Sequence, residues 1–212
     1  MAEPYGLLVA GFNYSDAAED EFNDWYDLEH VPERLRTKGF INAQRWLDIE
    51  DPKVSIATYD MESLAVLQSP DYLKIGGVNL SVWTKRVTAK CQRICRFEAE
   101  QLEPGRTAAP ADAGALLMIA MNVAPEADSE YNTWIREEHM PALAAVPGNL
   151  CARRFRMPAG THRYVVLHHL TSPDVAASAA WKAAAETPWT HKIRTHTSDR
   201  LRLLLRPYVR KS

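Results

Sequence analysis

The stretch EFNDWYDLEHVPERLRTKGFINAQR, residues 21–45, is written a second time in this chain as EYNTWIREEHMPALAAVPGNLCARR, residues 130–154. Residues 21 and 130 open the two copies, so every matched position is 109 residues apart. A single offset held this regularly indicates a tandem duplication. The identical pairs are Glu21/Glu130, Asn23/Asn132, Trp25/Trp134, Glu29/Glu138, His30/His139, Pro32/Pro141, Gly39/Gly148, Ala43/Ala152 and Arg45/Arg154.

The same register extends to both sides of this stretch. It includes Leu7/Leu116, Leu8/Leu117 and Asn13/Asn122 upstream, and reaches Ser63/Ser172 downstream. A chain of 212 residues has room for two domains of about 100 residues each. We therefore predict a first unit at residues 1–102, a linker rich in Pro, Gly and Ala at 103–114, and a second unit at 115–212.

The composition is that of an ordinary globular protein, with 46% apolar and 25% charged residues. A formal net charge of −2 argues against nucleic acid as the main partner. The three cysteines lack the spacing of a zinc site, so we expect reduced thiols and a cytoplasmic protein with no metal. The N-terminus does not resemble a secretion signal, and residues 115–121 are far short of the roughly 20 apolar residues that cross a bilayer, so no membrane partner is expected.

The residue pattern predicts the same order of elements in both units, β-α-β-β-α-β. Gly39 and Gly148 follow the first helix of each unit, where a residue tolerant of the left-handed conformation is favoured. Trp83 is expected in a loop, as are His191 and His196 after Pro188-Trp189. The predicted strands are 5–14, 40–49, 54–61 and 92–102, then 115–123, 150–157, 162–170 and 200–208; the predicted helices are about 15–38 and 62–75, then about 126–145 and 173–186.

Two helices on one face of a four-stranded sheet leave the other face bare, and packing two such units sheet to sheet covers it. A strand, a helix bearing W-x-x-x-E-H-x-P, a Gly and a hairpin together resemble the EthD-like branch of the dimeric α/β-barrel (ferredoxin-like) superfamily. The resemblance implies an α+β fold in which two ferredoxin-like units form a barrel within one chain. It also implies a wide range of functions: isomerases, polyketide cyclases, cofactor-free oxygenases and haem enzymes.

Glu29 and His30 lie on the helix that carries this motif, as do Glu138 and His139 in the second copy. At about 100° per residue, each Glu points with the neighbouring aromatic residues into the core, and each His lies at the edge of that stripe. A buried carboxylate needs partners, which strand-end amides or an indole N–H could supply, while each His could cap its helix. The other reading places His in a pocket as general acid/base with Glu orienting it, and the resemblance implies such a His.

Other polar residues recur on strands. Asn13 and Asn122 are either turn formers at a strand end or polar anchors in a pocket. Arg45 and Arg154 either pair with a helix or bind a substrate carboxylate.

Tyr59 and His168 occupy matching positions on the third strand of each unit. The two copies therefore present different acid/base groups there, and only one cavity is expected to be active if that face is the interior. His169 would point to the opposite face.

We expect a cofactor-independent enzyme that transfers a proton by His-based acid/base chemistry, of isomerase, cyclase, dehydratase or lyase type. Its substrate would be a small apolar aromatic or polyketide-like compound, with catalysis by His30, His139, His168 or Tyr59 and with Trp25 and Trp134 holding the ring. One alternative is a haem-binding or haem-dependent protein, in which an inward His is the axial ligand. The other is a non-catalytic ligand-binding protein, and a homodimer is left open in each case.

Overall fold

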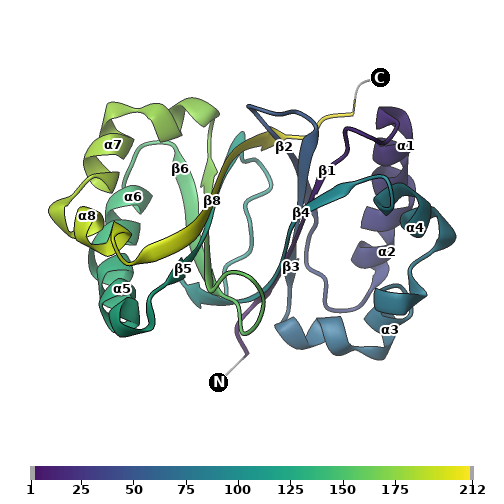
Figure 1. The fold of residues 1–212 in the computed structure, drawn as a ribbon, viewed down its shortest axis with the longest axis horizontal. Helices are drawn as coiled ribbons and strands as arrows, with labels where there is room; N and C mark the ends of the chain where they lie inside the picture. Colours follow the sequence, from purple (N-terminus) through teal and green to yellow (C-terminus); the bar gives the residue numbers. More distant parts are fainter. Residues whose placement is uncertain (1–2, 211–212) are drawn as a thin grey trace. The chain divides into compact units, whose positions relative to one another are not determined.

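The computed structural model describes residues 3–210, which form an α+β structure with two compact units (Figure 1). The first unit comprises the chain up to Glu100 and the segment from Tyr208 onward. The second unit comprises Gln101–Pro207.

The sheet of the first unit is antiparallel, with β4 beside β1, β1 beside β3, and β3 beside β2. β1 is a central strand, with β3 on one side and β4 on the other, and it is buried along nearly its whole length. A bulge shifts the pairing of β1 and β4 between Gly11 and Phe12. The strands are β1 (Gly6–Asn13), β2 (Gln44–Asp48), β3 (Val54–Met61) and β4 (Gln92–Glu103).

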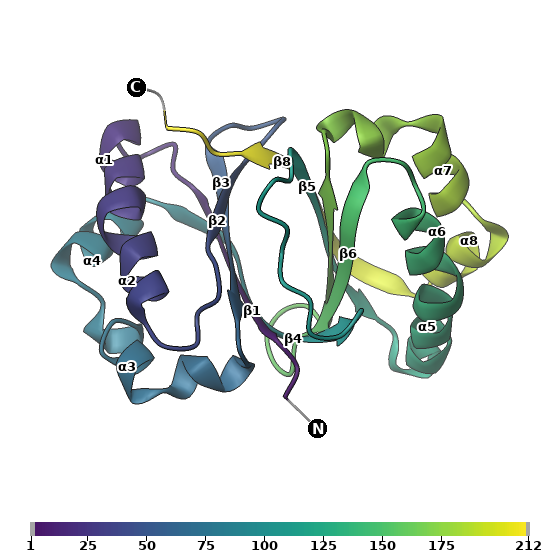
Figure 2. The same cartoon turned by 180° about the vertical axis from the view of Figure 1, so that it is seen from behind.

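The helices of the first unit all lie on one side of its sheet, as the two opposite views show (Figures 1 and 2). A continuous helical segment comes first, with a wider π-helical turn in its middle. The helices are α1 (Glu19–Asp24), the π turn Trp25–His30, α2 (Val31–Arg36), α3 (Pro70–Leu73) and α4 (Val82–Thr88), with 3₁₀ turns at Leu64–Gln68 and Gly77–Asn79.

The second unit has the same order of strands, with β8 beside β5, β5 beside β7, and β7 beside β6, all antiparallel. Its first helical segment also contains a π turn. The elements are β5 (Ala115–Val123), α5 (Asp128–Trp134), the π turn Ile135–His139, α6 (Met140–Ala144), β6 (Asn149–Arg156), β7 (Tyr164–Leu170), α7 (Ala179–Ala185), α8 (Pro188–Arg194) and β8 (Thr197–Pro207), with 3₁₀ turns at Pro125–Ala127 and Pro173–Ala177.

The glycine predicted at the end of each first helical segment is confirmed. Gly39 has φ of +97° and Gly148 has φ of +90°, a region that side-chain-bearing residues rarely adopt. A Cβ built on Gly39 would lie 2.5 Å from Val66 Cγ2, and one on Gly148 would lie 2.6 Å from Val175 Cγ2. Glycine is therefore required at both positions by conformation and by space.

The prediction of loops around Trp83 and His191 was wrong. Trp83 lies in α4 and His191 lies in α8. These helices are only seven residues long, too short to show an apolar periodicity. Their N-cap residues are nevertheless of the favoured types: Ser81 and Thr187 each accept a hydrogen bond from a backbone N–H three residues on.

The second strand was predicted too long in the first unit. The strand covers only Gln44–Asp48 and pairs with β3 from Gln44 to Leu47, while Phe40 makes an isolated bridge to Met61. Within residues 3–210, no helix has both the length and the apolar character needed to cross a bilayer.

Candidate functional site

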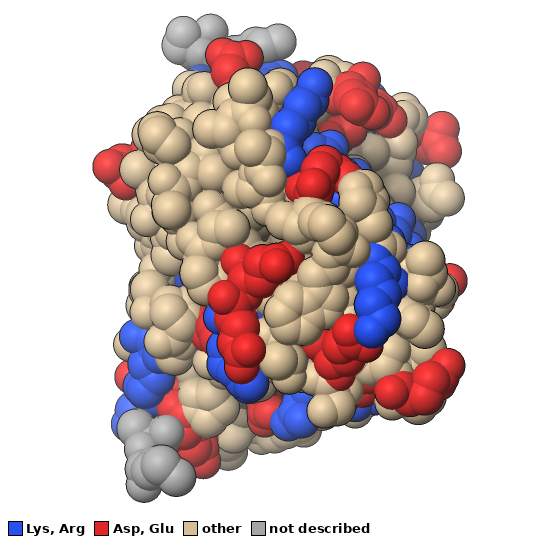
Figure 3. Space-filling view, turned by 90° about the vertical axis from the view of Figure 1, so that its left-hand side faces the viewer, with Lys and Arg blue, Asp and Glu red and all other residues tan. Residues whose placement is uncertain are grey.

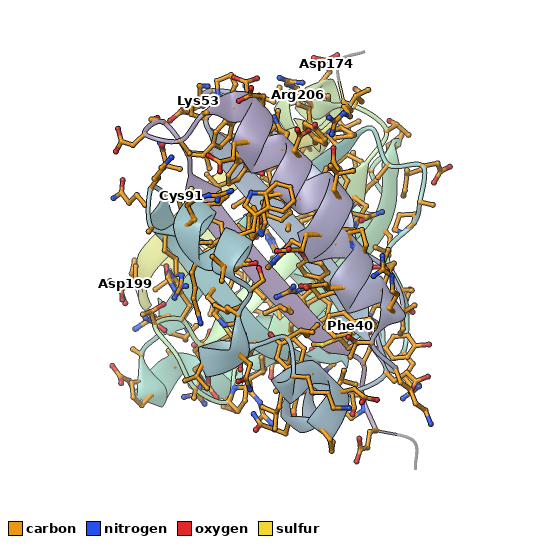
Figure 4. All side chains as sticks on the ribbon, turned by 90° about the vertical axis from the view of Figure 1, so that its right-hand side faces the viewer. Phe40, Lys53, Cys91, Asp174, Asp199 and Arg206 are labelled. Carbon is orange, nitrogen blue, oxygen red and sulfur yellow. The ribbon has the colours of Figure 1, made fainter. Side chains whose placement is uncertain are left out.

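The first unit holds a cavity of about 290 Å³ between its sheet and its helices. Figure 4 looks onto the helical layer of this unit, with Phe40 and Lys53 at opposite ends of the view. Side chains from β1, β3 and β4 meet side chains from the π turn, α2 and the α3–α4 region around this space. The lining residues are Leu8, Ala10, Phe12, His30, Arg34, Tyr59, Tyr72, Gly76, Gly77, Leu80, Thr88, Arg93 and Arg96.

The π turn brings His30 into this cavity. Pro32 has no backbone N–H, and its ring would clash with the carbonyl four residues earlier in a regular α-helix. The helix widens instead, and the N–H of Val31 bonds to the carbonyl of Tyr26, five residues back. The same bond joins Met140 to Ile135 ahead of Pro141 in the second unit.

The π turn changes which face of the helix is buried. The expectation that Glu29 points into the core while His30 lies at its edge was wrong, because a π turn adds a residue and rotates the rest of the helix about its axis. His30 is 8% exposed, whereas Glu29 is only partly buried.

His30 is held by aromatic rings and not by a hydrogen bond at Nδ1. Its ring centroid lies 4.4 Å from that of Trp25 and 5.3 Å from that of Tyr26. Nδ1 is buried and has no hydrogen-bond partner within residues 3–210. Burial first, and then nearby arginine guanidiniums, hold the pKa of His30 well below its usual value of 6.5. His30 is therefore a neutral imidazole at pH 7, the form that accepts a proton.

Tyr59 supplies a neutral hydroxyl to the same cavity. It is fully buried on β3, and its hydroxyl has no hydrogen-bond partner among the described residues. Burial raises the pKa of Tyr59 to about 12. A buried hydroxyl that bonds to nothing in the protein is costly, and a ligand oxygen would satisfy it.

Three arginines that the sequence reasoning did not select also line the cavity. Arg34 on α2 is only 3% exposed, whereas Arg93 and Arg96 on β4 are exposed. A signal for Arg34 was present in the repeat, because the matching position in the second copy is Leu143. The sequence interpretation used the difference between Tyr59 and His168 but did not compare the two copies at Arg34.

The second unit has a smaller cavity of about 170 Å³ that His139 and Leu143 line. The ring of His139 stacks on Trp134 at a centroid distance of 4.2 Å, and burial, followed by the charge of Arg194, lowers the pKa of His139 to about 4. A further space of about 50 Å³ lies beside His139 and Trp134. His139 is thus placed like His30, in a more confined site.

His168 is not among the residues that line either of these two spaces. Its Nδ1 lies 3.2 Å from Asn149 Nδ2, and its ring makes an edge contact with Trp181 at 5.0 Å. Burial lowers the pKa of His168 to about 3. The structure therefore brings His30 and Tyr59 together around one cavity, while His139 and His168 share none of the cavities described above.

The repeated glutamates tie the two helical segments of each unit together. Glu29 Oε1 accepts a hydrogen bond from Ser81 Oγ at 2.5 Å and one from Thr84 Oγ1 at 3.2 Å. Glu138 Oε1 accepts one from Thr187 Oγ1 at 2.6 Å. Because Ser81 and Thr187 are the N-caps of α4 and α8, each glutamate anchors a helix start. Neither glutamate lines the cavity around His30 or the one around His139.

Arg45 and Arg154 donate to the first helical segment of their own unit. Arg45 Nη2 bonds to Asn23 Oδ1 at 2.7 Å, and Arg154 Nη1 bonds to Asn132 Oδ1 at 2.9 Å. Carboxylates complete the pairing: Asp27 for Arg45 at 2.8 Å and Glu103 for Arg154 at 2.6 Å. These contacts match the helix-paired alternative, and neither arginine lines a described cavity.

The side chains of Asn13 and Asn122 make hydrogen bonds at strand ends. Asn13 Oδ1 accepts hydrogen bonds from the N–H and the hydroxyl of Ser15, as in an Asx-turn. Asn122 Nδ2 donates to the carbonyl of Thr161 and to Asp199. Asn122 lines an open surface hollow of the second unit.

Trp25 lies behind the cavity and does not form part of its wall. Its Nε1 donates to Thr84 Oγ1 at 2.9 Å, and its ring packs against His30. Trp134 has no such bond, because its buried Nε1 has no hydrogen-bond partner within the described part of the chain.

The helical face of the second unit mixes acidic and basic side chains without a large area of one sign (Figure 3). Such a surface does not steer polyanions.

Among residues 3–210, no group of three His, Cys, Asp or Glu side chains is placed to hold a metal ion.

No protein-family model matches the sequence, and no curated protein is significantly similar to it. Solved structures do share its fold. A "putative monooxygenase" from Fusobacterium nucleatum is 12% identical, with 98% of this chain and 94% of that chain covered at a TM-score of 0.66. An anthrone oxidase-like protein is also 12% identical, covering 96% of this chain and 92% of that one at a TM-score of 0.66. A haem-binding protein from Thermus thermophilus is 9% identical, covering 98% and 92% at a TM-score of 0.62. Over nearly its whole length, the chain shares the fold of these solved structures.

Proposed function

We propose that the cavity of the first unit is the active site of an enzyme that moves a proton on a small, largely apolar, aromatic or polyketide-like compound without a cofactor. The observation that carries this proposal is the pairing of a neutral imidazole with a neutral phenol around one cavity. His30 would take a proton from a carbon next to a carbonyl, and Tyr59 would donate a hydrogen bond to the oxygen on which negative charge develops.

Apolar walls support this role. Leu8, Phe12 and Leu80 line the cavity beside His30 and Tyr59. Burial of His30 beside these side chains strengthens its electrostatic interactions and keeps the imidazole unprotonated.

Formation of an enolate by proton removal is a step that isomerisation, dehydration and oxygen addition to carbon can share. The names of two structural neighbours, a monooxygenase and an anthrone oxidase-like protein, agree with such chemistry. Isomerase, cyclase and lyase activities remain alternatives within the same proposal.

The test is incorporation of deuterium from D₂O into ketones with acidic C–H bonds, such as 2-tetralone and anthrone, followed by ¹H NMR. The wild-type protein is expected to accelerate exchange above the buffer rate, and His30→Gln is expected to lower that acceleration by about 100-fold or more. Thermal unfolding would show that the variant is folded. Exchange at the wild-type rate by folded His30→Gln would overturn the assignment of the base.

Haem binding is the second candidate, because one structural neighbour is a haem-binding protein. His30 could offer an axial nitrogen, and arginines could pair with propionates. The space does not fit, however: about 290 Å³ lies at the lower limit of small-molecule sites, which span about 300–1,000 Å³, and a tetrapyrrole is among the larger ligands of such sites. A Soret band that appears on hemin titration and is lost in His30→Gln would favour haem.

A non-catalytic binding protein is the third candidate. It would hold 2-tetralone or anthrone saturably and leave their deuterium exchange at the buffer rate. Native mass spectrometry of the purified protein would report both a bound compound and whether two chains pair.

We also propose that the two units arose by duplication of one ferredoxin-like ancestor of the EthD-like branch, with domains at 1–102 and 115–212. The repeated Glu29/Glu138, Gly39/Gly148 and Arg45/Arg154 pairs support this, since each pair makes equivalent contacts in its unit. Packing of the units sheet to sheet as a barrel belongs to the same proposal, and small-angle X-ray scattering would test it.

A further inference from the structure

Positive charge in the cavity of the first unit is not balanced by acidic residues in its wall. Arg34, Arg93 and Arg96 line the cavity, and no carboxylate does. Glu33 pairs with Arg34 at 3.0 Å and Glu98 pairs with Arg96 at 2.6 Å, both from outside the wall.

Arg93 has no carboxylate partner among the described residues. Its guanidinium lies 5.9 Å from the ring centroid of Phe12, a cation–π contact that does not neutralise the charge. Arg93 therefore contributes an uncompensated positive charge at the exposed side of the cavity.

Arg34 is the deepest of the three arginines. It is 3% exposed, and its Nη1 donates to the carbonyl of His30 at 3.3 Å and to Glu33. Its Nε is buried without a hydrogen-bond partner within residues 3–210. An unsatisfied N–H on a buried guanidinium costs free energy that an acceptor oxygen from a ligand would recover.

The second unit shows that Arg34 is not needed to build this fold. Leu143 holds the matching position on α6, is 1% exposed, and lines the smaller cavity beside His139. The same backbone position thus accepts an apolar side chain in a unit with the same strand order. Packing alone therefore does not explain why an arginine occupies position 34.

We propose that the cavity of the first unit takes an aromatic carboxylate, whose carboxyl group is bound by Arg34 and attracted by Arg93 and Arg96 while its ring lies against Leu8 and Phe12. This inference rests on the proposed function, since it names the substrate class of that same site. Arginine presents donors in a geometry that suits carboxylate oxygens, and the apolar walls suit the ring.

The test is isothermal titration calorimetry with 1-naphthoate and its neutral isostere 1-naphthamide. The wild-type protein is expected to bind 1-naphthoate at least about tenfold more tightly than 1-naphthamide, because one charge-assisted hydrogen bond is worth that ratio or more. Arg34→Leu, which copies the second unit, is expected to remove the preference. Arg93→Ala, at an exposed position, is expected to reduce it several-fold and to leave less dependence on salt.

Arg200→Ala is the matched control, because Arg200 lies beside the second cavity and is expected to leave 1-naphthoate affinity unchanged. If Arg34→Leu does not fold, Arg34→Gln and Arg93→Ala carry the test. Equal binding of the two probes by the wild-type protein would overturn the inference, as would an undiminished preference in folded Arg34 and Arg93 variants.

The two proposals can fail separately. Deuterium exchange that depends on His30 without any preference for 1-naphthoate would leave the catalytic role and remove the carboxylate. A preference for 1-naphthoate that depends on Arg34 without deuterium exchange would leave the carboxylate site and remove the proton transfer.

Discussion

Ser81 donates its hydroxyl hydrogen to the carboxylate of Glu29, so the first helical segment of the unit holds the N-cap of α4. Glu138 and Thr187 make the same bond in the second unit. The glutamate of the repeated motif therefore joins helices and lines neither the cavity around His30 nor the one around His139.

Glu29→Ala is expected to lower the free energy of unfolding by about 2 kcal/mol, because it removes a charge-assisted hydrogen bond and leaves the cap side chain without its partner. Glu29→Gln keeps an acceptor oxygen and should cost less. Urea unfolding measures both, and Glu138→Ala should show a loss of similar size. A Glu29→Ala protein as stable as wild type would contradict this anchoring role.

Tyr59→Phe is expected to leave stability unchanged or to raise it by about 1 kcal/mol, since the buried hydroxyl has no partner to lose among the described residues. The same change should slow deuterium exchange by about tenfold or more, because the developing oxyanion loses its donor. Thermal unfolding and the exchange assay are the two measurements. A variant that loses stability but not activity would show that Tyr59 is structural.

Arg45→Gln is expected to cost about 2–3 kcal/mol of stability, because the guanidinium bonds to Asn23 and Asp27 and lies 3.8 Å from the ring centroid of Tyr208. The affinity for 1-naphthoate should not change in the folded variant. Urea unfolding and calorimetry check the two halves. Loss of 1-naphthoate binding at unchanged stability would restore Arg45 as a carboxylate ligand.

Stability should fall as the pH is lowered through the histidine range. In the folded state the pKa of His139 is about 4, below its usual 6.5, so the unfolded state binds the proton more readily between these values. The contribution of His139 is complete above pH 6.5 and is lost as the pH falls toward 4.

His139→Gln should therefore weaken this dependence. Between pH 7.5 and pH 5, wild-type stability should drop by about 1–2 kcal/mol more than that of the variant. Urea unfolding at the two pH values measures the difference. Parallel losses in the two proteins would mean that His139 titrates normally.

The sequence predicted the strands closely because their apolar runs and turn residues are local signals. β3 and β5 begin and end where they were expected. The π turns could not be predicted from the sequence, because the effect of Pro32 on the helix register depends on which backbone hydrogen bond is broken. That one change exchanged the burial of Glu29 and His30.

The site was harder to predict than the fold, because the search for site residues concentrated on residues that the two copies share. Several positions kept in both copies hold the fold together, as Arg45 with Asn23 and Glu29 with Ser81 show, whereas the shared His30 and His139 each line a cavity. The cavity differs between the units where the copies differ, at Arg34 against Leu143 and at Tyr59 against His168. Only the structure places Arg34 beside His30 and Tyr59.

The most direct measurement is deuterium incorporation into 2-tetralone by His30→Gln and His139→Gln, compared with the wild-type protein under the same conditions. Both changes replace an equivalent histidine of a π turn, so each controls for the structural effect of the other. We predict that His30→Gln loses the acceleration by about 100-fold or more and that His139→Gln keeps it within about twofold. Loss of exchange in His139→Gln with full activity in His30→Gln would contradict the assignment of the active site to the first unit.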